Sequence, residues 1–254
     1  MSLELVVLGT GAFAAGLIDA VVGGGGLIQI PLLLATFPTT PIAVLFGTNK
    51  LASIVGTGGA AIHYARSLDI PKHIALPATL AALPGAALGA MAVSLLPPSS
   101  VRPLVFVLLL LVGLYTFFKP DFGRLEGHGR IQHKLPWYSA LLGLTLGFYD
   151  GFFGPGTGSF LIFGFVALFG LDMLHASASS KFVNLATNFA ALCYFAYQGS
   201  VMWKVGLVMA VCNLLGGQVG ARLSLRHGSR FVRLMLLVIV SILLCKLGWD
   251  LFSK

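Results

Sequence analysis

Two stretches of the chain are alike: GLIDAVVGGGG at residues 16–26 and GFYDGFFGPGTG at residues 147–158. In each, an apolar run with one aspartate ends in a cluster of glycines. A second, unusually short apolar run follows, at residues 27–37 and 158–171. These runs are too short for an ordinary membrane-spanning helix, which needs about 20 residues. Short, glycine-interrupted segments at corresponding positions of two halves predict a binding site built on broken helices.

The similarity between the two halves extends beyond these stretches. A shift of 131 positions, without a gap, aligns residues 16–90 with the second half. The matching pairs are Gly16–Gly147, Asp19–Asp150, Gly23–Gly154, Gly25–Gly156, Lys50–Lys181, Gly85–Gly216 and Gly89–Gly220. Matches among Ala and Leu mean little in so apolar a sequence, but Asp and Lys are scarce in it. Their coincidence predicts an internal repeat.

The composition predicts a membrane protein. Of the 254 residues, 57% are hydrophobic and only 9% are charged, and the mean hydropathy is +0.94. A soluble domain usually carries about 25% charged residues, because its surface faces water. The sequence therefore predicts an all-α polytopic membrane protein. Its apolar runs lie at residues 3–22, 27–37, 42–64, 73–95, 101–118, 137–153, 158–171, 173–197, 201–221 and 231–252.

The basic loops predict how the two halves are oriented. If each half makes five crossings, the basic loops 65–72, 119–136 and 222–233 all lie on one side. If the short segments return to their own side, the first two loops oppose the third. The positive-inside rule favours five crossings. Because five is odd, we expect two five-segment inverted repeats, with both termini in the periplasm.

The domain organisation follows from this repeat. Residues 1–118 form the expected first transmembrane repeat, residues 119–136 a cytoplasmic linker, and residues 137–254 the second, inverted repeat. The first segment has no Arg or Lys before it, which favours a transmembrane helix over a signal peptide.

Several classes of function are excluded by the sequence. The net charge of +8 suggests nucleic acid, but basic residues at the loop ends of a membrane protein are topology signals. The three cysteines lie inside apolar runs and show no metal-binding spacing. No phosphate-binding loop of the ATPase type occurs. We therefore expect no nucleic acid, no metal and no cofactor.

Four ionisable residues lie deep in apolar segments: Asp19, Lys50, Asp150 and Lys181. A charge at the centre of a transmembrane helix costs about 2.5–3.5 kcal/mol on insertion scales, and it usually faces a cavity or a partner. In the functional interpretation, the lysines attract an anion and the aspartates are counter-charges or proton carriers. In the structural interpretation, two Asp–Lys bridges hold the helices together. Both interpretations stay open.

The glycine clusters favour an anion site. A helix that begins inside the membrane presents unpaired N–H groups and partial positive charge to a ligand. Hydroxyl and amide groups beside the lysines add hydrogen-bond donors. The predicted substrate-binding residues are Lys50, Lys181, Asn49, Ser180, Gly24, Gly25, Gly26, Gly156, Thr157, Gly158 and Asn184. Close helix packing and hydrogen bonding between helices are the alternative roles for the glycines and the neutral polar residues.

The two stretches, with Pro31 and the run Thr48-Asn49-Lys50, resemble the repeats of the TauE/SafE family over nearly the whole chain. The resemblance implies a bacterial inner-membrane protein that transports sulfite, sulfonates or related anions. The first motif reads GGGG and the second GPGTG, so the two half-sites need not contribute equally.

The expected function is a secondary transporter that moves small anions by alternating access, and the resemblance implies that these are sulfur-containing oxyanions such as sulfite, sulfonates and thiosulfate. Asp19 and Asp150 would couple transport to protons or form structural ion pairs. The alternatives are a passive anion channel and an intramembrane enzyme that uses the two aspartates. Besides the anion and the lipid bilayer, the sequence leaves a homo-oligomer open, together with the exact anion, its direction of transport and the coupling ion.

Overall fold

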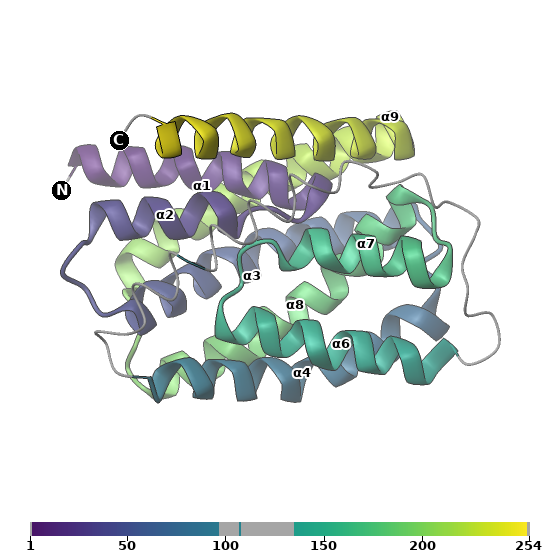
Figure 1. Cartoon of the computed structure of the whole chain (residues 1–254), viewed down its shortest axis with the longest axis horizontal. Helices are drawn as coiled ribbons and strands as arrows, with labels where there is room; N and C mark the ends of the chain where they lie inside the picture. The colour runs from purple at the N-terminus through teal and green to yellow at the C-terminus, as the bar shows by residue number, and fades with distance from the viewer. Residues whose placement is uncertain (1, 97–106, 108–134, 253–254) are drawn as a thin grey trace.

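The computed structural model describes residues 2–96, 107 and 135–252, which are helical apart from short connections (Figure 1). The helices are α1 (Ser2–Val22), α2 (Gly26–Thr36), α3 (Ile42–Ser67), α4 (Lys72–Ser94), α6 (Leu135–Phe152), α7 (Thr157–Phe169), α8 (Met173–Tyr197) and α9 (Trp203–Phe252). This confirms the predicted all-helical class. The predicted run 101–118 and linker 119–136 fall, apart from residues 107, 135 and 136, outside the described residues.

Three of the described helices are both long and apolar enough to cross a membrane, over Glu4–Val22, Lys72–Ser94 and Trp203–Val232. Helices α2 and α7 are apolar but have only 11 and 13 residues. At 1.5 Å per residue they are about 16 and 20 Å long, against a hydrocarbon core of about 30 Å. The predicted short segments are therefore present as half-length helices.

Helices α3 and α8 occupy the middle of the bundle, between the pair α1 and α9 and the pair α4 and α6 (Figure 1). They carry most of the buried polar and charged side chains of the described residues. A polar group in hydrocarbon must find a partner inside the protein. The central position of these two helices provides those partners and defines where a polar site can form.

Helix α9 contains two helices, as the sequence predicts, but the break between them is shorter than the predicted loop. The sequence predicts apolar runs 201–221 and 231–252 with a basic loop at 222–233, but the chain is helical from Trp203 to Phe252 except at Gly228. There φ is 69° and ψ is −167°, which turns the chain sharply. Arginine is a good helix former and the side chains of Arg226 and Arg230 are exposed. The basic residues therefore need no loop, and only the glycine interrupts the helix.

Glycines let α4 pack backbone to backbone against α6. A Cβ atom added at Gly85 would lie 2.4 Å from the carbonyl oxygen of Leu144. One added at Gly89 would lie 2.1 Å from the carbonyl oxygen of Phe148. Both distances are far below van der Waals contact, so only glycine allows this approach. Close packing of small residues replaces the hydrophobic effect as a source of helix association in lipid.

The same arrangement joins α9 to α1. A Cβ atom at Gly216 would lie 2.0 Å from the carbonyl oxygen of Phe13, and one at Gly220 would lie 2.4 Å from that of Leu17. Gly216 and Gly220 lie 131 positions after Gly85 and Gly89. Phe13 and Leu17 lie 131 positions before Leu144 and Phe148, so the two contacts are built from matching residues. The sequence repeat is therefore matched by a repeat of residue contacts.

We expect Gly216→Ala to lower the thermal stability of the protein in detergent by several degrees. The added methyl group would overlap the carbonyl oxygen of Phe13, and overpacking costs about 1–3 kcal/mol. Gly58→Ala is the matched control, because its Cβ atom would meet Leu185 Cδ1 at an ordinary 3.5 Å. The measurement is the apparent Tm from intrinsic fluorescence. An unchanged Tm for Gly216→Ala would contradict the role of this contact.

Candidate functional site

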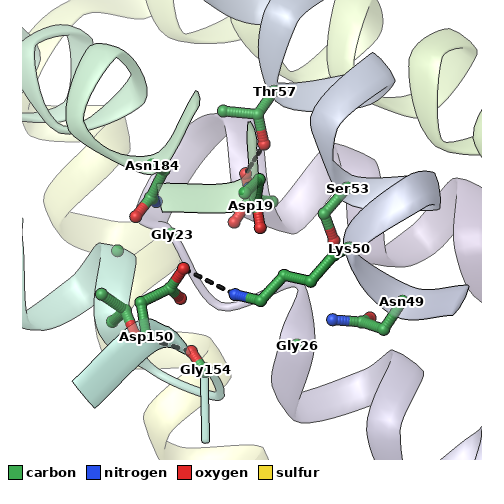
Figure 2. Close-up of a pocket in the computed structure, with 13 residues that line it drawn as sticks. Asp19, Gly23, Gly26, Asn49, Lys50, Ser53, Thr57, Asp150, Gly154 and Asn184 are labelled. Carbon is green, nitrogen blue, oxygen red and sulfur yellow. Dashed lines mark hydrogen bonds and ion pairs between the residues drawn. The ribbon is translucent and has the colours of Figure 1, made fainter. Parts of the chain in front are cut away.

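A small polar pocket lies at the centre of the bundle, where both helix breaks meet α3 and α8 (Figure 2). Its lining residues are Asp19, Gly23, Gly26, Asn49, Lys50, Ser53, Thr57, Asp150, Gly154, Thr157, Gly158, Asn184 and Asn188. Its volume is about 20 Å³, which is room for about one water molecule. The pocket is thus closed around its polar groups in this conformation.

Both halves of the chain build the pocket from matching positions. Pairs of lining residues offset by 131 positions are Asp19 and Asp150, Gly23 and Gly154, Gly26 and Thr157, Ser53 and Asn184, and Thr57 and Asn188. The pocket therefore lies where the two repeats meet. This is the position at which repeat-based transporters hold substrates.

Lys50 is the cation of the pocket. Its Nζ atom lies 2.6 Å from Asp150 Oδ2, and the two side chains are only 4% and 7% exposed (Figure 2). A Cβ atom at Gly154 would lie 3.4 Å from the Lys50 ammonium, so the glycine leaves space for it. A buried charge is tolerated only when it is paired. Asp150 supplies this pairing, and any anion that binds Lys50 would compete with it.

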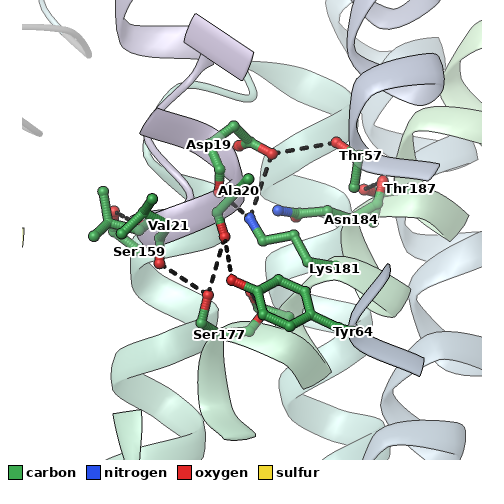
Figure 3. Close-up of polar contacts among 12 residues, drawn as sticks. Asp19, Ala20, Val21, Thr57, Tyr64, Ser159, Ser177, Lys181, Asn184 and Thr187 are labelled. Atoms are coloured by element: carbon green, nitrogen blue, oxygen red, sulfur yellow. Dashed lines mark hydrogen bonds and ion pairs between the residues drawn. The ribbon is translucent and has the colours of Figure 1, made fainter. Parts of the chain in front are cut away.

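Lys181 lies outside the pocket and is fully buried. Its ammonium donates to the backbone carbonyl of Asp19 and lies 3.3 Å from the Asp19 carboxylate (Figure 3). The Thr57 hydroxyl donates to the same carboxylate at 3.2 Å. Each lysine therefore pairs with the aspartate of the other half. Among the described residues, the carboxylate of Asp19 contacts Lys181 and Thr57, that of Asp150 contacts Lys50, and no hydrogen bond joins the two carboxylates.

Side chains from three other helices satisfy the end of α1 (Figure 3). The last four carbonyls of a helix have no partner within it, and lipid offers none. Here Lys181 donates to Asp19 O, Tyr64 to Ala20 O at 3.0 Å, Ser177 to Val21 O at 2.9 Å, and Ser159 to Val22 O at 2.7 Å. These bonds pair the carbonyls at the end of α1 within the protein.

The end of α6 is supported differently. The positions that correspond to Tyr64, Ser177 and Ser159 hold Phe195, Phe46 and Ile28, which cannot donate. Bonds within the break take their place: the Tyr149 hydroxyl donates to Pro155 O at 2.8 Å, and the Thr157 hydroxyl to Gly154 O at 2.7 Å. Other helices thus hold the first break, whereas the second break is held by its own turn.

Six of the predicted binding residues line the pocket: Lys50, Asn49, Gly26, Thr157, Gly158 and Asn184. The other five, Lys181, Gly24, Gly25, Gly156 and Ser180, do not. Gly25 packs against α1, where an added Cβ atom would lie 2.9 Å from Ala15 O. Gly156 caps α7 with a φ of 83°. The Ser180 hydroxyl donates to Ser177 O at 2.7 Å.

Five lining residues are absent from the predicted set: Gly23, Ser53, Thr57, Gly154 and Asn188. Their spacing from a lysine along the same helix could have identified three of them. Ser53 and Thr57 follow Lys50 by three and seven positions, and Asn188 follows Lys181 by seven, so each shares a helix face with its lysine. The sequence does not reveal that the glycine at the start of each break faces the pocket.

Two polar atoms at the pocket have no partner among the described residues. They are the side-chain oxygens of Asn49 and Asn184, which are buried. A buried polar atom without a partner costs about 1–3 kcal/mol. A water molecule or a ligand that donates a hydrogen bond would recover this cost, because an amide oxygen only accepts.

We expect Ser177→Ala to lower the apparent Tm, because it leaves the carbonyl of Val21 unpaired at a cost of about 1–3 kcal/mol. Ser179→Ala is the matched control. Ser179 is equally buried on the same helix, but its hydroxyl has no partner among the described residues. Its removal should leave the Tm unchanged or slightly higher. Equal effects of the two substitutions would refute the role of the α1 carbonyls.

Comparison with known proteins identifies relatives over nearly the whole chain. The family model described as Sulfite exporter TauE/SafE matches residues 8–247. A probable membrane transporter protein, ORF9, of Sinorhizobium sp. is 42% identical over 94% of this chain and 90% of its own length. No solved structure matches the chain.

Two further relatives are also named probable membrane transporter proteins. The one from Haemophilus influenzae is 34% identical over 97% of this chain and 95% of its own length. YfcA of Escherichia coli K12 is 35% identical over 94% of this chain and 87% of its own length. With apolar helices, a central polar pocket and this coverage, the chain belongs to the TauE/SafE family of membrane transporters.

Proposed function

We propose that the protein is a secondary transporter that moves small, sulfur-containing oxyanions across the bacterial inner membrane by alternating access. The observation that carries this proposal is the Lys50 ammonium, which is buried in a central pocket lined by both halves of the chain. Hydroxyl and amide groups surround it, and these suit the oxygens of sulfite, sulfonates or thiosulfate. The name of the matching family, sulfite exporter, supports the same substrate class.

The two halves of this transporter are inverted repeats. In Figure 1, α1 runs from left to right, whereas its counterpart α6 runs from right to left. Helices α2 and α7 also run in opposite directions. The repeated glycine contacts between α4 and α6 and between α9 and α1 support the same relation. Inverted repeats permit alternating access, because the two halves can exchange conformations across the membrane.

The basic end of the bundle faces the cytoplasm and both termini face the periplasm. Arg66 and Arg222 lie together at one end, beside the connection that leads to Lys72. The start of α1 and the end of α9 lie at the other end (Figure 1). The positive-inside rule supports this orientation.

Proton coupling follows from the charges in the pocket. An anion that approaches Lys50 meets the negative charge of Asp150, which already neutralises the ammonium. Protonation of Asp150 removes this competitor and frees Lys50 for the anion, so the pocket stays neutral when a proton and a singly charged anion bind together. Because the closed pocket has a volume of only about 20 Å³, binding also requires it to widen. The pocket would open to one side of the membrane at a time, and this opening is the proposed transport movement.

The second ion pair has a structural role in this conformation. Lys181 is held by the carbonyl and the carboxylate of Asp19 and does not line the pocket. It closes the end of α1 rather than offering its charge to a ligand. Lys50 and Lys181 therefore contribute unequally to anion binding.

We expect Lys50→Met to reduce anion uptake about 10- to 100-fold, because a hydrogen bond to a charged group contributes about 1.5–3 kcal/mol. The measurement is uptake of labelled sulfite into proteoliposomes, with thiosulfate and taurine as competitors. Lys204→Met, which removes an exposed lysine of α9, should retain uptake. Normal flux in well-folded Lys50→Met protein would overturn the proposed site.

We expect Asp150→Asn to transport without responding to a pH gradient, since asparagine imitates the protonated carboxyl group. Wild-type uptake should rise when protons and anion move in the same direction. Asp69→Asn, which neutralises an exposed carboxylate outside the pocket, should keep the wild-type response. Saturable flux with counterflow would exclude a passive channel. A gradient response that persists in Asp150→Asn would contradict this coupling mechanism.

A further inference from the structure

A second polar cavity lies away from the pocket, in a groove between α3 and α9. Its volume is about 580 Å³, and it shares no lining residue with the central pocket. Its polar part is formed by His63 and Arg66 of α3 and by Gln218 and Arg222 of α9. Its apolar part is formed by Ile54, Val55 and Leu214. The groove is therefore amphipathic along its length.

The dimensions of this groove match one leaflet of a bilayer. Twelve positions separate Ile54 from Arg66, which is about 18 Å along a helix. Half of the hydrocarbon core is about 15 Å thick. Arg66 lies in the last turn of α3, next to the connection to α4, and Arg222 of α9 lines the same groove; the apolar residues Ile54 and Val55 lie earlier in α3. A lipid with an acyl chain along Val55 and a headgroup at Arg66 would follow this gradient.

The two arginines are available for a ligand. Arg66 and Arg222 are exposed, and neither makes a hydrogen bond or ion pair with the described residues. None of the described residues that line the groove is acidic. A guanidinium group binds the oxygens of a phosphate through two parallel hydrogen bonds. Basic pockets between transmembrane helices are typical sites for anionic lipid headgroups.

The other half of the chain lacks these features at the corresponding positions. With the offset of 131, the counterparts are Phe189 for Gly58, Tyr197 for Arg66 and Met91 for Arg222. An aromatic side chain therefore takes the position of Gly58, and neither arginine has a charged counterpart. The Asp and Lys of the polar centre recur in both halves of the sequence, but the features of this groove do not. Its glycine and arginines are therefore not a by-product of the repeat.

We propose that the groove between α3 and α9 binds an anionic phospholipid, with its phosphate between Arg66 and Arg222 and an acyl chain along the apolar part. The lipid bridges α3, which carries Lys50, and α9, which packs on α1. It stabilises the contact between these two helices. The proposal does not depend on which anion the central pocket transports.

The test measures the apparent Tm of delipidated protein in detergent with added phosphatidylglycerol or phosphatidylcholine. We expect phosphatidylglycerol to raise the Tm by several degrees, because a ligand that binds only the folded state stabilises it. Phosphatidylcholine and sodium phosphate should have no comparable effect. In Arg66→Gln/Arg222→Gln protein, the shift caused by phosphatidylglycerol should disappear.

Arg226→Gln/Arg230→Gln is the matched control, because it removes the same charge from exposed positions on α9 outside the groove. It should keep the full shift. Native mass spectrometry should detect bound phosphatidylglycerol on wild-type and control proteins and lose it on the groove variant. Equal stabilisation by phosphatidylcholine or by phosphate alone would overturn the proposal. So would a shift that survives in the groove variant or is lost in the control.

Discussion

The structure depends on pairing the backbone carbonyls at the end of α1 inside the protein. A helix that ends in water leaves its last carbonyls to the solvent, but one that ends in hydrocarbon cannot. Here the carbonyls at the end of α1 receive donors from Tyr64, Ser159, Ser177 and Lys181. These residues lie on α3, α7 and α8, so the break can exist only after those helices have packed around it.

The pairing of charges follows from the same constraint. Lys50 bonds Asp150 across the pocket, and Lys181 bonds Asp19 behind it. Both bridges join one half of the chain to the other, so neither half can bury its charges alone. The pairs also differ: both residues of the first pair line the pocket, whereas in the second pair only Asp19 does and Lys181 closes the end of α1. An internal repeat can thus keep the same Asp and Lys and still assign them different tasks.

Sequence reasoning predicts the helices well, because hydropathy and glycine clusters are local signals. Nine of the predicted segments correspond to described helices or parts of them, and the two short ones are present as α2 and α7. The loop predicted at residues 222–233 is shorter than expected, because the break between the two helices is confined to Gly228. Charge alone does not terminate a helix, since exposed arginines are compatible with one.

The sequence by itself determined that the protein lies in a membrane, that its halves repeat, and that Asp19, Lys50, Asp150 and Lys181 belong to its polar centre. Composition and the offset of 131 positions contain this information directly. Only the tertiary structure decided which lysine faces the pocket, because that depends on which aspartate and carbonyl each ammonium reaches across the bundle. It also decided that Gly25 and Ser180 serve packing, whereas Gly23, Gly154 and Thr57 line the pocket. A residue's type is local, but its partner comes from a helix that may be more than 100 positions away.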